Sequence, residues 1–404
     1  MDARLSPRLP IFACAGLILF LFLANLWNFA VERDWPKLRI RSAQPLAGVS
    51  RPAPAPWSWD AFLSGETQRA VSSNLGQGSP MFPISVRAKN QFLYALFKTS
   101  GVANIVVGKG EQLFETSYID EFCRRGAPPD PSVLGEWANA VAQIRDAVAA
   151  REKSFAYLVS PSKPAYEPGW LPPERPCAAL RQGRDTEKLR PYAAALAARG
   201  VPYVEAQSLM RRARAEYPIE MFPRGGTHWN LLGAALALRE ITQAFAAQPT
   251  GSPLGAFDVD WREADVAGGT DRDLLDLLNL VWPPDHYPTA AVFRRGPAGA
   301  CDKPPRLLLV GDSFLRELVV VAAQARCPPI VDHWFYMRSE NGDVTLTRYL
   351  TQPGEIGNGE RLGTDLSLLP ESFAQADAVL LQENAINLTK TRQVRELLEA
   401  VRGR

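Results

Sequence analysis

The sequence lacks the patterns by which nucleic-acid, nucleotide and metal sites are usually recognised. Its 404 residues carry a formal net charge of only +2, so no excess of basic residues points to nucleic acid. Neither G-x-G-x-x-G nor a Walker pattern occurs, which leaves no Gly-rich loop for a nucleotide phosphate. The five cysteines and three histidines show no zinc-type spacing. We therefore expect no metal, no cofactor and no nucleic-acid partner.

One long apolar run is present at the N-terminus. Residues 11–30 contain no charged side chain and would extend about 30 Å as a helix, the thickness of a bilayer core. The run is longer than the apolar region of a cleavable signal peptide, and Trp27 near its end suits a membrane interface. We predict an uncleaved single-pass anchor after a tail of residues 1–10, with a cleaved signal as the alternative. Basic residues flank the run on both sides, but one large following domain is usually translocated, so we expect the bulk outside the cytoplasm.

A linker and one large domain are predicted after the anchor. Residues 31–75 form the linker, in which alternating Pro and Ala within 42–58 favour an extended spacer. The chain as a whole has an ordinary globular composition, and we predict the domain at residues 76–404. The simplest pairing of its four cysteines is Cys123–Cys177 with Cys301–Cys327, which an oxidising compartment would permit; four unpaired thiols are the alternative.

Strand-like and helix-like segments alternate from about residue 80 onward. This alternation predicts an α/β fold with a mostly parallel sheet and helices on both faces. Residues 250–300 are rich in Gly, Asp and Pro, and we predict an irregular insertion near the edge of the sheet, with one helical piece at 272–280. Strand patterns fall at 104–107, 155–159, 201–204, 307–310, 329–333 and 378–381, and helical patterns at 134–152, 186–199, 231–247, 314–326 and 390–402.

Ser313 occupies the most informative position in the chain. It lies in Gly311-Asp312-Ser313-Phe314, between an apolar strand pattern and a helical pattern. A serine on such a turn would lie at the C-terminal edge of the sheet, where α/β folds bind ligands and where a nucleophile can be displayed beside an oxyanion hole. Asp312 would cap the following helix or brace the turn. An ordinary turn without chemistry is the alternative.

A serine nucleophile needs a general base, and only three histidines are available. His228 follows Gly225 and Gly226 on a loop that enters a helix, which makes it the best candidate. His333, at the end of a weak strand, is the rival base. We expect His286 on a surface loop in the insertion.

Two motifs in this order resemble a known family. Thr-His-Trp-Asn at 227–230 followed by Gly-Asp-Ser-Phe at 311–314 is similar to the SGNH-hydrolase-like domain of the alginate O-acetyltransferases AlgX and AlgJ. Val-Val-Gly-Lys at 106–109, Pro-Ser-Lys at 161–163 and Asp-Arg-Asp-Leu-Leu at 271–275 resemble further segments of the family. The similarity covers roughly residues 80–390.

This resemblance implies an SGNH-hydrolase-like, flavodoxin-like fold and an extracytoplasmic O-acetyltransferase. Ser313 would accept an acetyl group, its backbone N–H would help to hold the oxyanion, and His228 would deprotonate first the serine and then a sugar hydroxyl. The implied partners are a bacterial exopolysaccharide and a membrane-bound O-acyltransferase that supplies acetyl at the inner membrane, with the catalytic domain in the periplasm. A polysaccharide acetyl esterase and a non-catalytic glycan-binding subunit of an export complex remain alternatives.

The chain departs from the family at Gly226, where the resemblance implies an Asp in Asp-x-His-Trp. Glycine cannot orient an imidazole. Another carboxylate, Asp332 or Glu383, is one explanation for the missing acid. Alternatively Thr227 or a backbone carbonyl orients the ring, or the domain binds glycans and catalyses little.

Several further side chains are candidates for sugar contacts. Arginines could bind an anionic polysaccharide and tryptophans could stack on sugar rings, although solvated arginines and buried tryptophans are commoner. These candidates are Arg224, Trp229, Asn230, Arg316 and Trp334.

Overall fold

The computed structural model describes most of the chain and divides it into two units. One unit comprises residues 1–103 with 275–283, and the larger one residues 104–274 with 284–404. The described residues are 9–32, 45–49, 57–78, 81–124, 129–175, 177, 184–295, 303–336, 344–352, 355–356 and 359–403.

The larger unit is built on a mixed sheet that has eight strands within the described residues. Five strands run parallel in the order β8-β7-β12-β3-β4, with β4 at one edge. On the other side β9 lies antiparallel beside β8 and pairs with β10 and β11. The predicted α/β fold with a mostly parallel sheet is confirmed. The strands are β3 (Ser154–Ser160), β4 (Tyr203–Glu205), β7 (Arg306–Gly311), β8 (Ile330–Tyr336), β9 (Val344–Gln352), β10 (Glu355–Ile356), β11 (Glu360–Gly363) and β12 (Ala378–Asn384).

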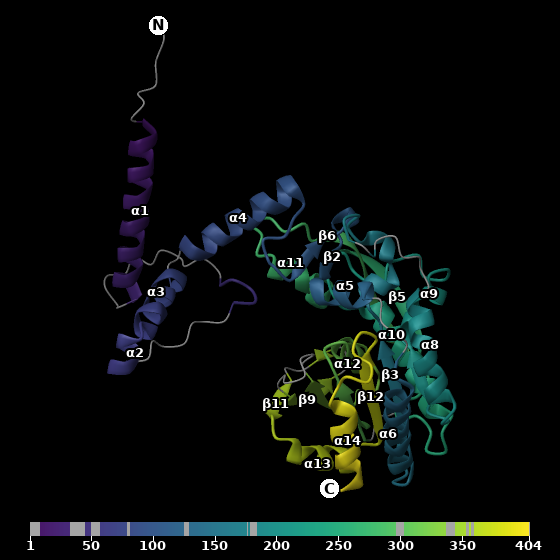
Figure 1. The fold of residues 1–404 in the computed structure, drawn as a ribbon. Coiled ribbons are helices and arrows are strands. Elements are labelled where there is room, and N and C mark those ends of the chain that lie inside the picture. Colours follow the sequence, from purple (N-terminus) through teal and green to yellow (C-terminus); the bar gives the residue numbers. More distant parts are fainter. Residues whose placement is uncertain are drawn as a thin grey trace. The chain divides into compact units, whose positions relative to one another are not determined.

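Helices cover both faces of this sheet (Figure 1). Successive residues of a strand point to opposite faces, so Leu309 of β7 packs with one helical layer and Leu308 with the other. Helices α9 (Ala206–Ala213), α10 (Leu231–Ala246) and α12 (Leu315–Ala323) form the first layer. Helices α6 (Pro131–Ala149), α8 (Arg184–Ala197), α13 (Leu369–Gln375) and α14 (Gln393–Arg402) form the second.

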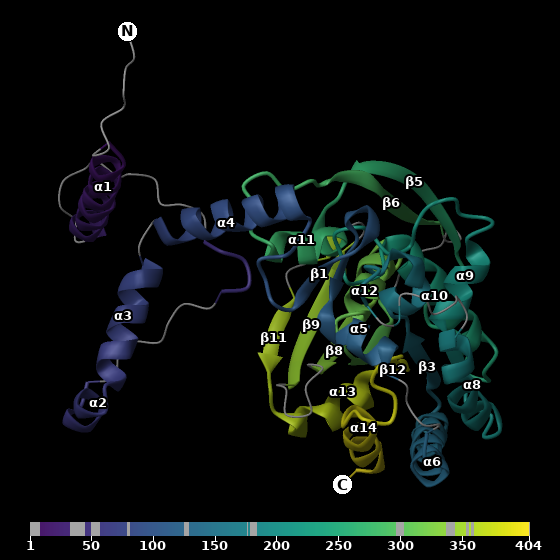
Figure 2. The ribbon, with the colours of Figure 1, turned by 45° about the horizontal axis from the view of Figure 1, so that its top comes forward.

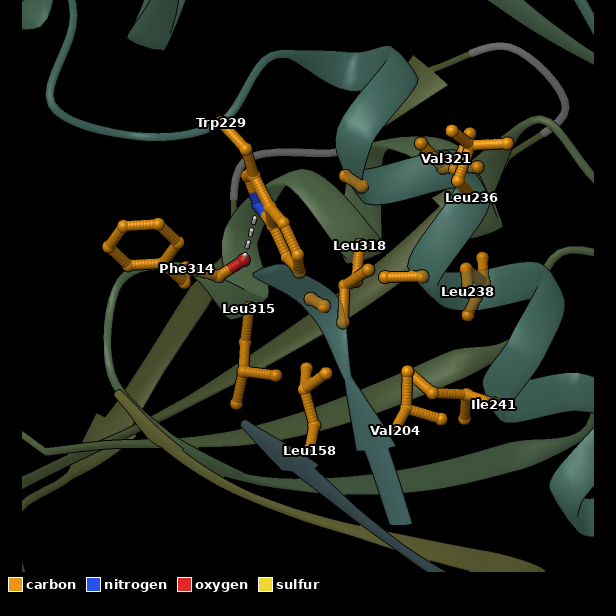
Figure 3. Packing of buried hydrophobic residues seen from close by; sticks show 14 of the residues in the cluster. Leu158, Val204, Trp229, Leu236, Leu238, Ile241, Phe314, Leu315, Leu318 and Val321 are labelled. Atoms are coloured by element: carbon orange, nitrogen blue, oxygen red, sulfur yellow. Dashed lines mark hydrogen bonds between the residues drawn. The ribbon is translucent and has the colours of Figure 1, made fainter. Parts of the chain in front are cut away.

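The core between α10 and α12 brings the two sequence motifs together (Figure 3). Leu236 of α10 and Leu318 of α12 are buried in this core. Trp229 precedes α10 and Phe314 precedes α12, and both are fully buried there. The Trp229 indole Nε1–H donates a 3.2 Å hydrogen bond to the Phe314 carbonyl. Hydrophobic packing therefore holds the starts of both helices next to each other.

The prediction of an irregular insertion at 250–300 is wrong. Strands β5 (Asp258–Val266) and β6 (His286–Arg295) form a long antiparallel hairpin (Figure 2). Ala290 and Val292 of β6 are buried in the core that contains α10. Between the strands lie η3 (Gly269–Arg272) and α11 (Asp273–Leu277), near the predicted helical piece. Charged residues along β5 hid the strand signal, because that strand is mostly exposed or half-buried.

The strand predicted at 104–107 does not join the large sheet. Strand β1 (Ile105–Val107) pairs instead with β2 (Leu113–Glu115) in a separate antiparallel pair. A disulfide joins Cys123 and Cys177, as the simplest pairing predicted. Cys327 is also disulfide-bonded, while Cys301 lies outside the described residues. Short helices complete this unit: η1 (Lys109–Glu111), α5 (Thr116–Cys123), α7 (Lys163–Tyr166), η2 (Pro168–Trp170) and η4 (Leu366–Leu368).

The first unit is helical where the sequence predicted the later part of a linker. The Ser58 hydroxyl accepts the Ala61 N–H at 3.0 Å and so caps α2, which is the usual role of serine at a helix start. The predicted boundary at residues 75/76 falls inside α3, and most of the spacer at 42–58 lies outside the described residues. The helices are α1 (Leu9–Glu32), α2 (Trp59–Leu63), α3 (Glu66–Gly78) and α4 (Met81–Phe97).

Helix α1 spans the run in which an anchor was predicted. Within the described part of the chain, we find no helix whose length and apolar character suffice for crossing a bilayer. Several α1 side chains lie outside that part, so the anchor stays a prediction.

We predict that the Cys123–Cys177 disulfide stabilises the larger unit. It closes a loop of 54 residues, so replacing both cysteines by serine should lower the free energy of unfolding by about 2–4 kcal/mol. Urea denaturation under non-reducing conditions measures this loss. Cys14, the free cysteine in α1, provides the control, because Cys14→Ser should leave the midpoint unchanged. An unaltered midpoint in the double variant would contradict the prediction.

Candidate active site

Ser313 lies on the turn between β7 and α12, as predicted. At Gly311 a Cβ atom would come within 2.2 Å of the Gln382 side-chain oxygen, so this close approach requires glycine. The Asp312 carboxylate accepts the Phe314 N–H at 2.9 Å and braces the turn, the role expected for it. The serine is thus presented at the C-terminal edge of the sheet.

A buried polar network on neighbouring strands supports the turn. The Gln382 side chain of β12 accepts the Asp312 N–H at 2.7 Å and donates to the Ser160 hydroxyl of β3 at 2.6 Å. The Asn384 amide also donates to Ser160, at 3.1 Å. All three network side chains are buried, so their mutual hydrogen bonds offset the cost of removing them from water. Sequence reasoning missed this network.

His228 connects Ser313 to an acid from the segment between β5 and β6. Its Nε2 lies 2.7 Å from the Ser313 hydroxyl, and its Nδ1 lies 2.5 Å from the Asp273 carboxylate. The second carboxylate oxygen accepts the backbone N–H groups of Thr227 at 2.9 Å and Leu274 at 2.6 Å. The arrangement has the nucleophile, base and orienting acid of a catalytic triad.

Comparison with known proteins identifies the family of the chain. Residues 105–319, slightly more than half of the chain, match the family described as SGNH hydrolase-like domain, acetyltransferase AlgX. The chain belongs to the AlgX acetyltransferase family. It is an SGNH-type acetyltransferase enzyme, and its sheet has the SGNH-like α/β arrangement.

Solved structures of low identity resemble this AlgX-family chain. The O-acetyltransferase domain of Pseudomonas putida AlgJ is 20% identical with a TM-score of 0.46, covering 74% of this chain and 99% of that one. Pseudomonas aeruginosa AlgX is 12% identical with a TM-score of 0.47, covering 74% and 67%. Bacillus cereus PatB1 with a sulfonyl adduct is 12% identical with a TM-score of 0.40, covering 70% and 94%. No curated protein sequence matches.

Steric exclusion by neighbouring backbone explains why the acid of this AlgX-family site does not stand at position 226. A Cβ atom on Gly226 would lie 2.5 Å from the Thr270 carbonyl and 3.1 Å from the Asp271 carbonyl. The backbone of η3 therefore occupies the volume that an acidic side chain at 226 would need. The same segment leads into α11 and places Asp273 beside His228. One feature of the sequence could have indicated this acid, namely the resemblance of residues 271–275 to a family segment.

Lys163 holds the loop that carries His228 in place through hydrogen bonds. Its ammonium group donates to the carbonyls of Pro223 at 2.7 Å, Gly226 at 2.9 Å and Arg224 at 3.1 Å, and it lies 5.2 Å from the Phe114 ring centroid. Burial, partly opposed by the charge of Asp273, lowers the pKa of Lys163 to about 7. Three carbonyl acceptors match the three donors of the ammonium group.

A tyrosine hydroxyl joins the histidine loop to the loop of the acid. Tyr287 of β6 accepts the Gly225 N–H at 3.2 Å and donates to the Asp271 carbonyl at 2.6 Å. Burial raises the pKa of Tyr287, which keeps this hydroxyl protonated and able to donate. The hairpin therefore positions both the base and its acid.

The environment of His228 favours its protonated form. Burial by itself lowers the pKa of His228, but the hydrogen bond with Asp273 and the negative charges of Glu317, Asp273 and Asp312 outweigh it and raise the pKa to about 9. A base that must carry a proton during the reaction is stabilised by such surroundings.

The carboxylates proposed from the sequence as replacements for the acid do not contact His228. Asp332 pairs with Arg348 at 2.6 Å, and Glu383 accepts the Trp137 indole N–H at 2.7 Å and the Tyr157 hydroxyl at 2.5 Å. Trp137 and Tyr157 belong to the hydrophobic core on the other face of the sheet from the α10–α12 core. Thr227 contributes its backbone N–H to Asp273 rather than orienting the ring. These three predictions are wrong because the hairpin already provides the acid.

The other histidines lie in unsuitable surroundings for a base. His333 is buried under the serine turn and hydrogen-bonds to the backbone of Gly311 and Asp312. Burial, followed by the charge of Arg316, lowers the pKa of His333 to about 4. His286 has 80% of its side chain exposed and begins β6, which agrees with its predicted surface position.

Most candidate sugar contacts have structural roles. Trp229 and Trp334 are fully buried, and Asn230 is buried and caps α10 by accepting the Gly233 N–H at 3.1 Å. Arg224 donates to the Pro284 carbonyl at 3.0 Å and lies over the Tyr287 ring, 4.7 Å from its centroid. Arg316 is exposed on the first turn of α12, one turn from the serine, and remains a candidate.

We predict that Asp273→Asn lowers kcat/KM for a small acetyl ester by about 10²–10⁴-fold, because His228 loses the acceptor that sets its tautomer. Steady-state kinetics with a chromogenic acetate measures the loss. Asp332→Asn is the matched control, since its carboxylate pairs with Arg348 instead. Equal rates for the two variants would rule out Asp273 as the orienting acid.

We predict that an acid at position 226 does not replace Asp273. In an Asp273→Ala background, adding Gly226→Asp should restore no activity, because the η3 backbone fills the space for the new side chain. The same ester assay compares the single and double variants, and thermal unfolding confirms that each is folded. Recovery of activity in the double variant would show that η3 yields to the side chain.

Proposed function

We propose that this enzyme is an extracytoplasmic O-acetyltransferase that transfers acetyl through Ser313 to a hydroxyl of a bacterial exopolysaccharide. The observation that carries the proposal is the continuous hydrogen-bonded chain Ser313–His228–Asp273. The chain's membership of the AlgX acetyltransferase family supports acetyl as the transferred group.

The first half-reaction loads the serine. The Ser313 hydroxyl attacks the acetyl carbonyl while His228 Nε2 takes its proton, and Asp273 stabilises the imidazolium through Nδ1. The Ser313 backbone N–H has no hydrogen-bond partner among the described residues, which leaves it available to the oxyanion. His228 then protonates the leaving group, and acetyl remains on the serine as an ester.

The second half-reaction transfers acetyl to the sugar. His228, neutral again, takes the proton of a sugar hydroxyl as that oxygen attacks the acetyl-serine carbonyl. The intermediate collapses, the ester bond to Ser313 breaks, and His228 returns the proton to the serine. An esterase would use the same residues with water as the acceptor, so the identity of the acceptor separates the two activities.

The proposal retains the location that the sequence predicts. Residues 11–30 would anchor the enzyme in the inner membrane, with the catalytic domain in the periplasm. A membrane-bound O-acyltransferase would supply acetyl there, and Arg316 beside the serine would contact an acidic polymer. The disulfides are consistent with an oxidising compartment.

An acetyl-enzyme trap tests the reaction. Full-length enzyme incubated with a chromogenic acetate and quenched in acid should carry one acetyl group on Ser313, detected by peptide mass spectrometry. Ser313→Ala and His228→Ala should abolish the label, because one removes the nucleophile and the other its base. Acetylated product after addition of an acidic oligosaccharide supports the transferase, and release of acetate alone supports an esterase. Absence of any serine label would overturn the proposal.

A further inference from the structure

A second carboxylate, unpredicted from the sequence, is buried beside the triad. Glu317 lies on α12 one turn after Ser313 and is 1% exposed. Carboxylates are rarely buried to this degree unless they are paired, because the charged form loses its hydration. One Glu317 oxygen has no hydrogen-bond partner among the described residues. Burying this carboxylate with one oxygen unpaired lowers the stability of the fold, which suggests that Glu317 has a functional role.

The contacts of Glu317 point to the catalytic machinery. Its side chain hydrogen-bonds to Thr270 of η3, the segment that leads to Asp273. It therefore connects the helix of the nucleophile to the loop of the acid. Its negative charge contributes to raising the pKa of His228, together with the hydrogen bond that Asp273 accepts from the ring.

We propose that Glu317 is a positioning residue of the acetyl-transfer site that holds η3 against α12 and stabilises His228 in its protonated form. The inference rests on the proposed function only in that His228 is the base. Imidazolium forms in both half-reactions, and a negative charge in a buried site stabilises it more than the same charge would in water.

The charged groups around Glu317 determine how it titrates. His228, from the loop before α10, favours its ionised form, whereas Asp273 of α11 disfavours it. Burial, the largest influence, raises the pKa of Glu317 to about 7. Glu317 and His228 thus form a coupled pair, and ionised Glu317 raises the pH at which His228 becomes a neutral base.

The test replaces the charge while preserving the shape. Glu317→Gln keeps an oxygen that can accept from Thr270 but removes the negative charge. Without that charge the pKa of His228 falls, so the acid limb of the kcat/KM profile for a chromogenic acetate should move to lower pH by about one unit or more. Glu383→Gln is the matched control. It makes the same change at an equally buried glutamate on the other face of the sheet, and its acid limb should stay at the wild-type pH.

A second measurement separates this inference from the proposed function. Titration of the full-length enzyme labelled with ¹⁵N-histidine follows the ring of His228 directly, and three histidines give few signals to assign. The Glu317→Gln variant should titrate about one unit lower than wild type, whether or not Ser313 becomes acetylated. Glu317→Asp, which retains the charge, should titrate near wild type and serves if Glu317→Gln does not fold. An unchanged His228 titration in Glu317→Gln, or an equal shift in both Glu317 variants, would overturn the inference.

Discussion

The two hydrogen bonds of the His228 imidazole determine where the other residues of the site have to lie. His228 has to reach a serine on the turn after β7 and an acid between β5 and β6, and these segments are distant in sequence. A misplacement of about 1 Å would break either bond, since both are short. The buried contacts around the ring therefore serve to bring a strand-to-helix turn and a hairpin loop to one point.

Polar groups buried beneath the surface provide much of that precision. Lys163 holds three carbonyls of the histidine loop, the Tyr287 hydroxyl bridges two loops, and Gln382 holds the serine turn. Each of these groups would be expensive to bury alone, and each is balanced by partners whose positions it determines. Apolar packing between α10 and α12 brings the segments together, and these directed bonds then select one arrangement.

Local pattern sufficed to predict the five parallel strands of the large sheet, the longest helices of the larger unit and the pairing of Ser313 with His228. Apolar runs such as 307–310 are local signals, and the scarcity of histidines narrowed the choice of base. The role of Asp273 could not be predicted, because it depends on a contact with His228, 45 residues away in sequence. Asp273 also lies between β5 and β6, and β5 is too polar to show a strand pattern. The roles of Lys163 and Glu317 were not predicted for a related reason. Charged residues are expected at the surface, and only the tertiary structure shows that these two are buried.

The glycine at position 226 and the acid at position 273 depend on each other. Viewed in sequence alone, glycine at 226 suggests an enzyme that has lost its acid, and three separate explanations for that loss were open. In the fold, the glycine is what allows the η3 backbone to approach the histidine loop closely, with carbonyls where a side chain would otherwise stand. That approach is also what brings the Asp273 carboxylate within 2.5 Å of the imidazole. The acid and the space it needs therefore depend on each other, so a residue that looks like a defect in the motif is a requirement of the triad.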